Sequence, residues 1–113
     1  MQPHGPDRYN EIYKPMRERA AKLQDEFHDF LGGDFTNPKA HVMHTDIKGL
    51  VDDIDSRKPL NGLDHRIKSI QNQLHQSKYA PDPIMDIKNL DYMHKNYGDM
   101  RLGIQRIEQQ DHF

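Results

Sequence analysis

Apolar residues recur along most of the chain in alternating steps of four and three positions. This spacing places them on one face of an α-helix, whereas the residues of a half-buried strand alternate at every second position. The first run lies within residues 7–31, and we expect its helix to be kinked or broken near Pro15, because proline lacks a backbone donor and clashes with the preceding turn. Gly32 and Gly33 are expected to end it, since glycine accepts the left-handed conformation of a helix end. The apolar positions of this run are Tyr9, Tyr13, Met16, Ala20, Leu23, Phe27 and Phe30.

Three further runs follow, and proline residues mark where their helices begin or end. The second covers residues 37–58 and opens at Asn37, a good N-cap, followed by Pro38 at the first helical position. An extended conformation over residues 40–44 is the alternative, with the helix beginning at Thr45. The third covers residues 61–79, and the fourth is expected to open at Asp82, which also precedes a proline. The apolar positions of these runs are Ala40, Met43, Ile47, Leu50 and Ile54, then Leu60, Leu63, Ile67, Ile70 and Leu74, then Leu90, Met93, Tyr97, Met100, Ile104 and Ile107.

The connections predicted between these helices are short, at residues 32–37, 57–61 and 79–82. Short connections favour antiparallel packing of consecutive helices. Further apolar residues beside the main rows widen each apolar face beyond the narrow seam of a two-stranded coiled coil. The sequence therefore predicts an all-α fold, a compact antiparallel bundle of about four helices. We expect a single domain over residues 1–113, with mobile ends at about 1–6 and 109–113.

The supply of core residues is small for a chain of this length. Leu, Ile, Val and Phe together make up 23 of the 113 residues, and the net charge is −2 at pH 7. A low apolar content is compatible with folding here because the net charge is too small to drive the chain apart. A thin core often indicates that a partner or a second copy supplies additional burial.

We interpret the chain as a non-enzymatic helical module for protein–protein interaction or assembly, which binds another protein or its own copy. The candidate contact residues are apolar side chains that lie off the main rows: Phe35, Val51, Ile84, Tyr92 and Leu102. The competing interpretation is that these residues complete the core or stand singly exposed, as apolar residues commonly do.

Motifs of catalysis and targeting are missing from the sequence. It has no cysteine, no glycine-rich loop with phosphate-binding spacing and no serine in a nucleophile elbow. We therefore expect neither an enzyme nor a cofactor. No apolar run approaches the ~20 residues of a membrane span, and the first residues lack the apolar core of a signal peptide. A cytoplasmic protein is the expectation, and secretion by a signal-less route stays open.

A basic third helix supports a second interpretation, a nucleic-acid-binding domain. Between Arg57 and Lys78 there are five basic residues and one acid, Asp64. Arg66, Lys68 and Lys78 would carry contacts to DNA or RNA, because arginine and lysine neutralise phosphates and arginine can read base edges.

The eight histidines raise a third interpretation, a metal-binding helical bundle. Two ligands three positions apart share a helix face and can grip one ion. Three such pairs occur: Asp25 with His28, His41 with His44, and Asp91 with His94. The apolar rows place all of them outside the core, so we expect no interior metal site. His41 and His44 form the alternative candidate, an exposed site. If all histidines were charged, the net charge would become +6.

Overall fold

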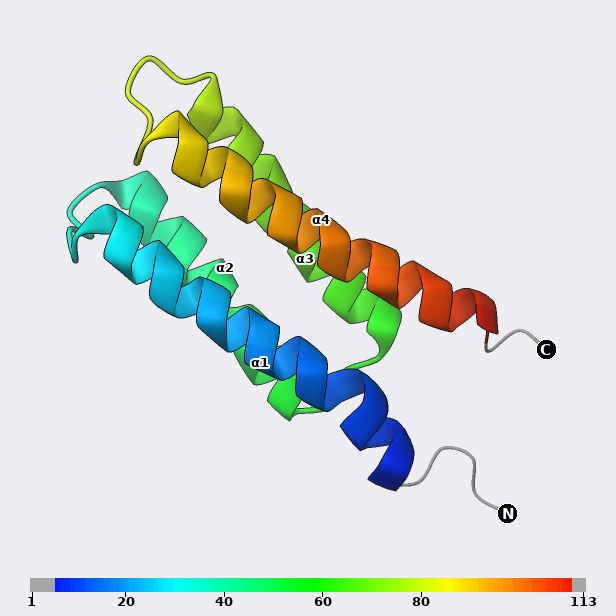
Figure 1. Ribbon diagram of the computed structural model, residues 1–113. Helices are drawn as coiled ribbons and strands as arrows, with labels where there is room; N and C mark the ends of the chain where they lie inside the picture. The colour runs from blue at the N-terminus through cyan, green and yellow to red at the C-terminus, as the bar shows by residue number, and fades with distance from the viewer. Residues whose placement is uncertain (1–5, 111–113) are drawn as a thin grey trace.

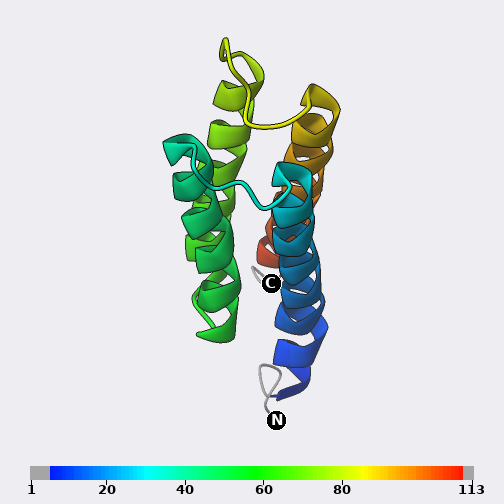
Figure 2. The same ribbon diagram turned by 90° about the vertical axis from the view of Figure 1, so that its left-hand side faces the viewer.

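The computed structural model describes residues 6–110, which form four α-helices and no strand. These are α1 (Pro6–Leu31), α2 (Pro38–Asp55), α3 (Leu60–Lys78) and α4 (Ile87–Gln110). The helices alternate in direction, and the bundle measures 54 × 22 × 18 Å. Connections 32–37 and 79–86 lie together at one end, which we call the loop end (Figures 1 and 2). The α2–α3 connection and both described chain ends lie towards the other. The predicted all-α antiparallel bundle is confirmed.

The four helices pack as a ring rather than as a crossed pair of layers. Each helix contacts the next along the chain, and α1 also contacts α4, whereas the diagonal pairs make no close backbone approach within the described residues. The contact between α3 and α4 is the most extensive, that between α1 and α2 comes next, and that between α1 and α4 is the smallest. The molecule is thus built from two helical hairpins.

The core is made of the apolar rows that the sequence predicts. Buried side chains from all four helices form one cluster. Its largest fully buried members are Tyr97, Phe27, Leu23, Met43, Ile47, Leu50, Ile54, Leu63, Ile67, Ile70, Leu74 and Leu90. The four-then-three spacing therefore marks the inward faces correctly wherever the side chains are described, and only the predicted side chain of Tyr9 lies outside that part.

Helix α1 runs through Pro15 without a break. Pro15 is exposed, so the backbone position that lacks a donor lies on the solvent side of the helix. The first turns of α1 depart from the line of the rest of the helix in Figure 1, which fits the expected kink rather than the expected break. At the other end, Gly32 (φ 63°) and Gly33 (φ 77°) take the left-handed conformation and end α1 as predicted.

The start of α4 differs from the prediction. Asp82 and Pro83 do not open the helix, which begins at Ile87. The Oγ of Ser77 accepts a hydrogen bond from the backbone N–H of Ile84 at 3.1 Å, and this holds the connection against the end of α3. Ile84 packs against the core, as does the buried Met85 that follows it. The connection therefore extends to residue 86 because it covers the end of the core.

One other helix end departs from the sequence-based expectation. Helix α2 ends at Asp55, and Arg57 takes the left-handed conformation (φ 56°) that usually falls to glycine. The backbone N–H of Lys58 donates to the carbonyl of Asp53, which closes the turn. Residues 1–5 and 111–113, which include most of the two predicted mobile ends, lie outside the described residues.

Candidate functional site

The five predicted partner-binding residues do not form one surface. Val51 is part of the buried core. Phe35 and Ile84 are partly buried and pack against the core near the loop end. Tyr92 and Leu102 are exposed at different levels of α4. Val51 therefore completes the core, and only the positions on α4 offer exposed apolar area.

Tyr92 also has a structural role between α1 and α4. Its hydroxyl donates to Oε2 of Glu26 at 2.8 Å, and this hydrogen bond raises the pKa of Tyr92. Its ring meets the ring of Phe30 edge to face, with centroids 6.0 Å apart. Because these contacts join the least extensive helix pair, Tyr92 serves the fold even though its side chain is exposed.

Exposed apolar side chains gather towards the loop end of the bundle. Among the described residues, the large apolar side chains that are exposed are Val42, Tyr79, Ile87, Tyr92 and Leu102. Of these, Leu102 alone lies in the far half of its helix. The apolar spacing did not single out Val42, because this residue stands beside Met43 of the apolar row. The signal that could have identified Val42 is that the row is complete without it, so its side chain is not needed in the core.

A groove between the start of α2 and the end of α3 lies beside Val42. It holds about 310 Å³, and α2 lines it with Pro38, Lys39, Val42 and Met43. From α3 it receives Gln73, Gln76 and Ser77. Lys39 is the one charged side chain in this lining, and no acid stands in the first turn of α2. The groove thus combines apolar walls with amide groups and a positive charge.

The start of α2 is fixed by its cap. The side chain of Asn37 accepts a hydrogen bond from the backbone N–H of Lys39 at 2.9 Å, and Pro38 takes the first helical position as predicted. On the opposite wall, Ser77 is held by its bond with Ile84. Both walls of the groove are therefore supported by local hydrogen bonds.

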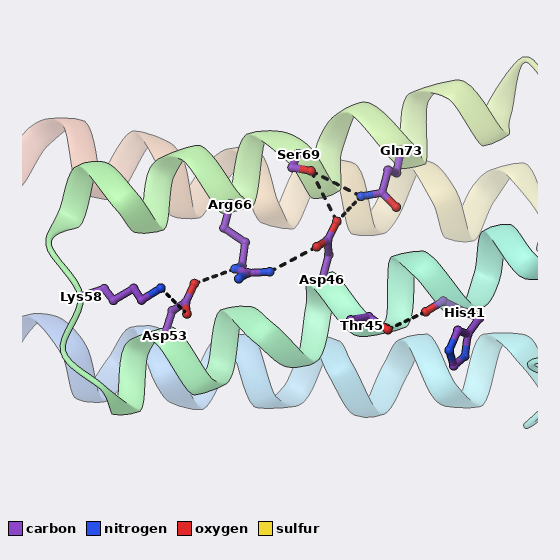
Figure 3. Close-up of polar contacts among 8 residues, drawn as sticks. All are labelled: His41, Thr45, Asp46, Asp53, Lys58, Arg66, Ser69 and Gln73. Carbon is purple, nitrogen blue, oxygen red and sulfur yellow. Dashed lines mark hydrogen bonds and ion pairs between the residues drawn. The ribbon is translucent and has the colours of Figure 1, made fainter.

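A polar network continues from the groove along the contact of α2 with α3 (Figure 3). Gln73 donates through its amide nitrogen to the carboxylate of Asp46. Asp46 also accepts from Nη1 of Arg66 at 3.2 Å, and Asp53 accepts from Nε of Arg66 at 2.6 Å. Lys58 approaches the other oxygen of Asp53 at 3.3 Å. This network fixes the Gln73 side chain that lines the groove.

The residues proposed for nucleic-acid binding are spread over different environments. Arg66 bridges two carboxylates inside the network. Lys78 pairs with Asp91 of α4 at 2.9 Å, and Lys68 is exposed. Because the charges of Arg66 and Lys78 are balanced within the bundle, the basic third helix does not present a continuous positive surface.

Two histidines of the α1–α2 hairpin, His28 and His44, contact the ring of Phe35. The Phe35 ring lies 5.2 Å from the ring of His28 and 4.8 Å from that of His44. Burial lowers the pKa of His44, and the positive charges of Lys48 and nearby histidines lower it further. His41, the other half of the predicted metal pair, is exposed. Within residues 6–110, histidine, aspartate and glutamate form no group of three or more placed to hold a metal ion.

Comparisons with known proteins give no relatives from which a role could be transferred. No protein-family model, curated protein or solved structure matches the chain. In the part of the chain that the structure describes, every helix is too short or too polar to cross a lipid bilayer. The function is therefore inferred from the surface of this molecule.

Proposed function

We propose that this chain is a non-enzymatic interaction module that binds a segment of another protein in the groove between α2 and α3. The observation that carries the proposal is the exposed side chain of Val42, which lines a hollow of about 310 Å³ between α2 and α3. An apolar side chain that the core does not need, placed beside a hollow, is typical of a contact surface.

The chemistry of the groove selects a partner with an apolar anchor and an acidic flank. The walls formed by Val42 and Met43 suit a side chain such as leucine or phenylalanine, whose burial contributes about 1.5–3 kcal/mol. Lys39 and the positive end of the α2 helix dipole favour a carboxylate next to that anchor. The amides of Gln73 and Gln76 can hydrogen bond to a peptide backbone.

A display library of short helical peptides tests this proposal directly. Each peptide carries a central leucine or phenylalanine, and the flanks are either acidic or basic. We expect acidic flanks to be enriched on the wild-type protein, and Lys39→Glu to reverse that preference. Val42→Asp should weaken the selected peptides at least about tenfold, as the loss of a central anchor does.

Leu102→Asp is the matched control for Val42→Asp. Leu102 is 52% exposed and Val42 is 56% exposed, so both variants replace a similarly exposed apolar side chain with the same acid. Leu102 lies outside the groove, and its variant should bind as the wild type does. Equal binding by Val42→Asp, or a preference for basic flanks, would contradict the proposal.

A second copy of this chain is the alternative occupant of the groove, and its binding must be distinguished from that of another protein. Sedimentation equilibrium of the wild type should give the monomer mass of 13.3 kDa at micromolar concentrations. A mass that rises with concentration, and falls back in Val42→Asp, would assign the groove to a second copy of this chain and overturn the proposed partner.

A further inference from the structure

The α2–α3 connection joins the two hairpins and is the shortest of the three connections. It consists of residues 56–59, whereas the other two cover residues 32–37 and 79–86. Arg57 takes the left-handed conformation there, with φ 56°, which is unfavourable for a residue that carries a Cβ. Pro59 is already extended, with φ −55° and ψ 150°, and a proline favours an extended residue before it as well. The chain therefore turns back at a strained residue, which would relax if the connection straightened.

Each hairpin is packed more closely within itself than against the other hairpin. The contacts of α3 with α4 and of α1 with α2 are the two most extensive in the bundle (Figure 1). The contacts of α2 with α3 and of α1 with α4, which join the hairpins, are smaller. Across the α1–α4 contact, the ion pair of Arg19 with Asp99 is exposed and therefore contributes little. A hairpin is thus the unit that can move as a whole.

Two buried polar atoms weaken the α1–α4 contact further. Within the described residues, no hydrogen-bond partner reaches Oε1 of Glu26 on α1 or the hydroxyl group of Tyr97 on α4. Burial raises the pKa of Tyr97, and the nearby charge of Glu26 raises it further. A buried polar group without a partner destabilises the packed state. The smallest helix contact therefore also carries unpaired polar groups, which favours its opening.

We propose that two copies of this chain exchange hairpins and form a domain-swapped dimer, in which the α1–α4 contact opens and residues 56–59 serve as the hinge. The inner face that one hairpin exposes on opening fits the other hairpin, because the two already pack together within one chain. A second copy therefore restores the contacts between hairpins, including those of Arg66 with Asp46 and Asp53. The two forms differ in the connection, where the dimer releases the strain at Arg57.

The exchange changes how the α2–α3 groove is built. In the dimer, Val42 of one copy lines the same groove as Gln73 and Gln76 of the other, so each groove has walls from two chains. The dimer then presents this groove twice. A partner with two suitable segments should bind the dimer more tightly than the monomer, because its second segment binds within an existing complex. This consequence rests on the proposed function, whereas the exchange itself does not.

Refolding at two protein concentrations tests the exchange. Chains refolded from urea at micromolar concentration should have the monomer mass of 13.3 kDa by light scattering, and chains refolded at millimolar concentration should include a species of twice that mass. Isotope-filtered NMR of labelled and unlabelled chains refolded together should then detect the contact of Phe30 with Tyr92 between different chains. The contact of Phe35 with His44 stays within one hairpin and is the internal control.

Two substitutions of Arg57 isolate the strain in the hinge, since both remove the guanidinium group and only one removes the Cβ. Glycine adopts a φ of 56° freely, so Arg57→Gly loses the strain that favours the dimer, and Arg57→Ala keeps it. Because each dimer contains two hinges, we expect the dimer of Arg57→Gly to be at least about tenfold weaker than that of Arg57→Ala.

Tyr97→Phe tests the role of the α1–α4 contact. The substitution removes the unpaired buried hydroxyl group from a contact that the monomer and the dimer share. It should therefore slow the interconversion of the two forms at least about fivefold, while it leaves their equilibrium unchanged. Dilution of the isolated dimer, followed by size-exclusion chromatography over time, measures both quantities.

Four results would overturn the proposal. They are a monomer mass alone after refolding at millimolar concentration, a dimer in which Phe30 contacts Tyr92 only within one chain, equal dimerisation of Arg57→Gly and Arg57→Ala, and a dimer that Val42→Asp abolishes. The last result would place the second copy in the groove, because Val42 lies outside the hinge and the α1–α4 contact. A swapped dimer that binds no peptide would contradict the proposed function alone.

Discussion

Two glycines inside helices make room for side chains of the neighbouring helix. A Cβ at Gly49 would lie 2.6 Å from Nη1 of Arg66, because the guanidinium group passes over this glycine on its way to Asp46 and Asp53. A Cβ at Gly98 would lie 3.0 Å from Nε2 of Gln71. Helix propensity alone makes both glycines weak points, yet each permits a polar contact between helices.

Replacing Gly49 by alanine should therefore destabilise the protein by about 1 kcal/mol, although alanine alone improves helix propensity by a similar amount. The added methyl group displaces Arg66, which leaves the nearly buried Asp53 carboxylate with a poorer partner. Urea denaturation of the variant and the wild type measures the change in the free energy of unfolding.

Gly103→Ala is the control for that substitution. Nothing lies within 4 Å of a Cβ at Gly103, so this variant should be more stable than the wild type by about 0.5–1 kcal/mol. In an Arg66→Ala background, Gly49→Ala should also become stabilising. A gain in stability from Gly49→Ala in the wild-type background would show that Arg66 moves at no cost.

Arg57 carries a side chain in a backbone conformation that suits glycine. Its φ of 56° closes the end of α2, and a Cβ in this region is unfavourable. Arg57→Gly should be more stable than Arg57→Ala by about 1 kcal/mol, since both variants lose the guanidinium group and only one keeps the Cβ. Thermal unfolding of the two variants side by side measures this difference, and equal stabilities would rule out backbone strain at this turn.

Local signals in the sequence predict local structure, and contacts between helices lie beyond them. Asn37 before a proline identifies the start of α2, and the glycine pair identifies the end of α1. Nothing next to Gly49 in the sequence indicates that Arg66 will pass over it. The groove is missed for the same reason, because its two walls come from residues at least 30 positions apart.

The helices are joined by contacts of different kinds. Helices α2 and α3 share the polar network around Arg66, and α3 and α4 share Asp64 with Arg101, whose Nε donates at 2.9 Å. Helices α1 and α4 meet least, through exposed pairs such as Arg19 with Asp99. Because exposed ion pairs contribute little, we expect the bundle to open first between α1 and α4.

His44, in the α1–α2 hairpin, should make the stability of the protein depend on pH. Burial first, and then nearby positive charge, lowers the pKa of His44 in the folded protein, whereas the unfolded chain keeps the ordinary value of about 6.5. Below that value the unfolded chain binds more protons, so the free energy of unfolding should fall as the pH drops from 7 to 5. Urea denaturation over this range measures the slope.

His44→Gln should flatten this pH dependence, because the side chain no longer titrates. His65→Gln, at an exposed position on α3, provides the comparison and should keep the wild-type slope. An identical slope in His44→Gln and the wild type would assign the pH dependence to other groups.

Element boundaries were predictable where capping decides them and not where burial decides them. The proline after Asp82 resembles a helix start, but Ile84 and Met85 turn towards the core before the helix begins. Burial of these two side chains and the bond to Ser77 outweigh the local preference of the proline. The end of the core that this connection covers exists only in the assembled bundle, so local sequence signals do not indicate it.

The complete molecule combines a small core with a nearly balanced surface charge. The net charge is −2 at pH 7 with neutral histidines, and the isoelectric point is about 6.4. Most of the exposed large apolar side chains in the described part lie towards the loop end. Near the isoelectric point, there is little electrostatic repulsion between molecules to oppose their association through these apolar side chains.

Non-specific association should therefore be greatest near pH 6.4 and weaker at pH 5 and pH 8. Light scattering at constant ionic strength across this range measures it. Val42→Asp and Leu102→Asp should each reduce scattering near pH 6.4, because each adds a negative charge and removes apolar surface. Scattering that does not change with pH would show that net charge does not control this association.

The described chain ends, Pro6 and Gln110, both lie towards the end of the bundle away from connections 32–37 and 79–86 (Figure 1). An anchor at either terminus, such as a biotin on a sensor surface or a fused fluorescent protein, would therefore hold the molecule by its base. The α2–α3 groove would then point into solution. Immobilised protein is thus suited to measuring peptide binding on a sensor surface.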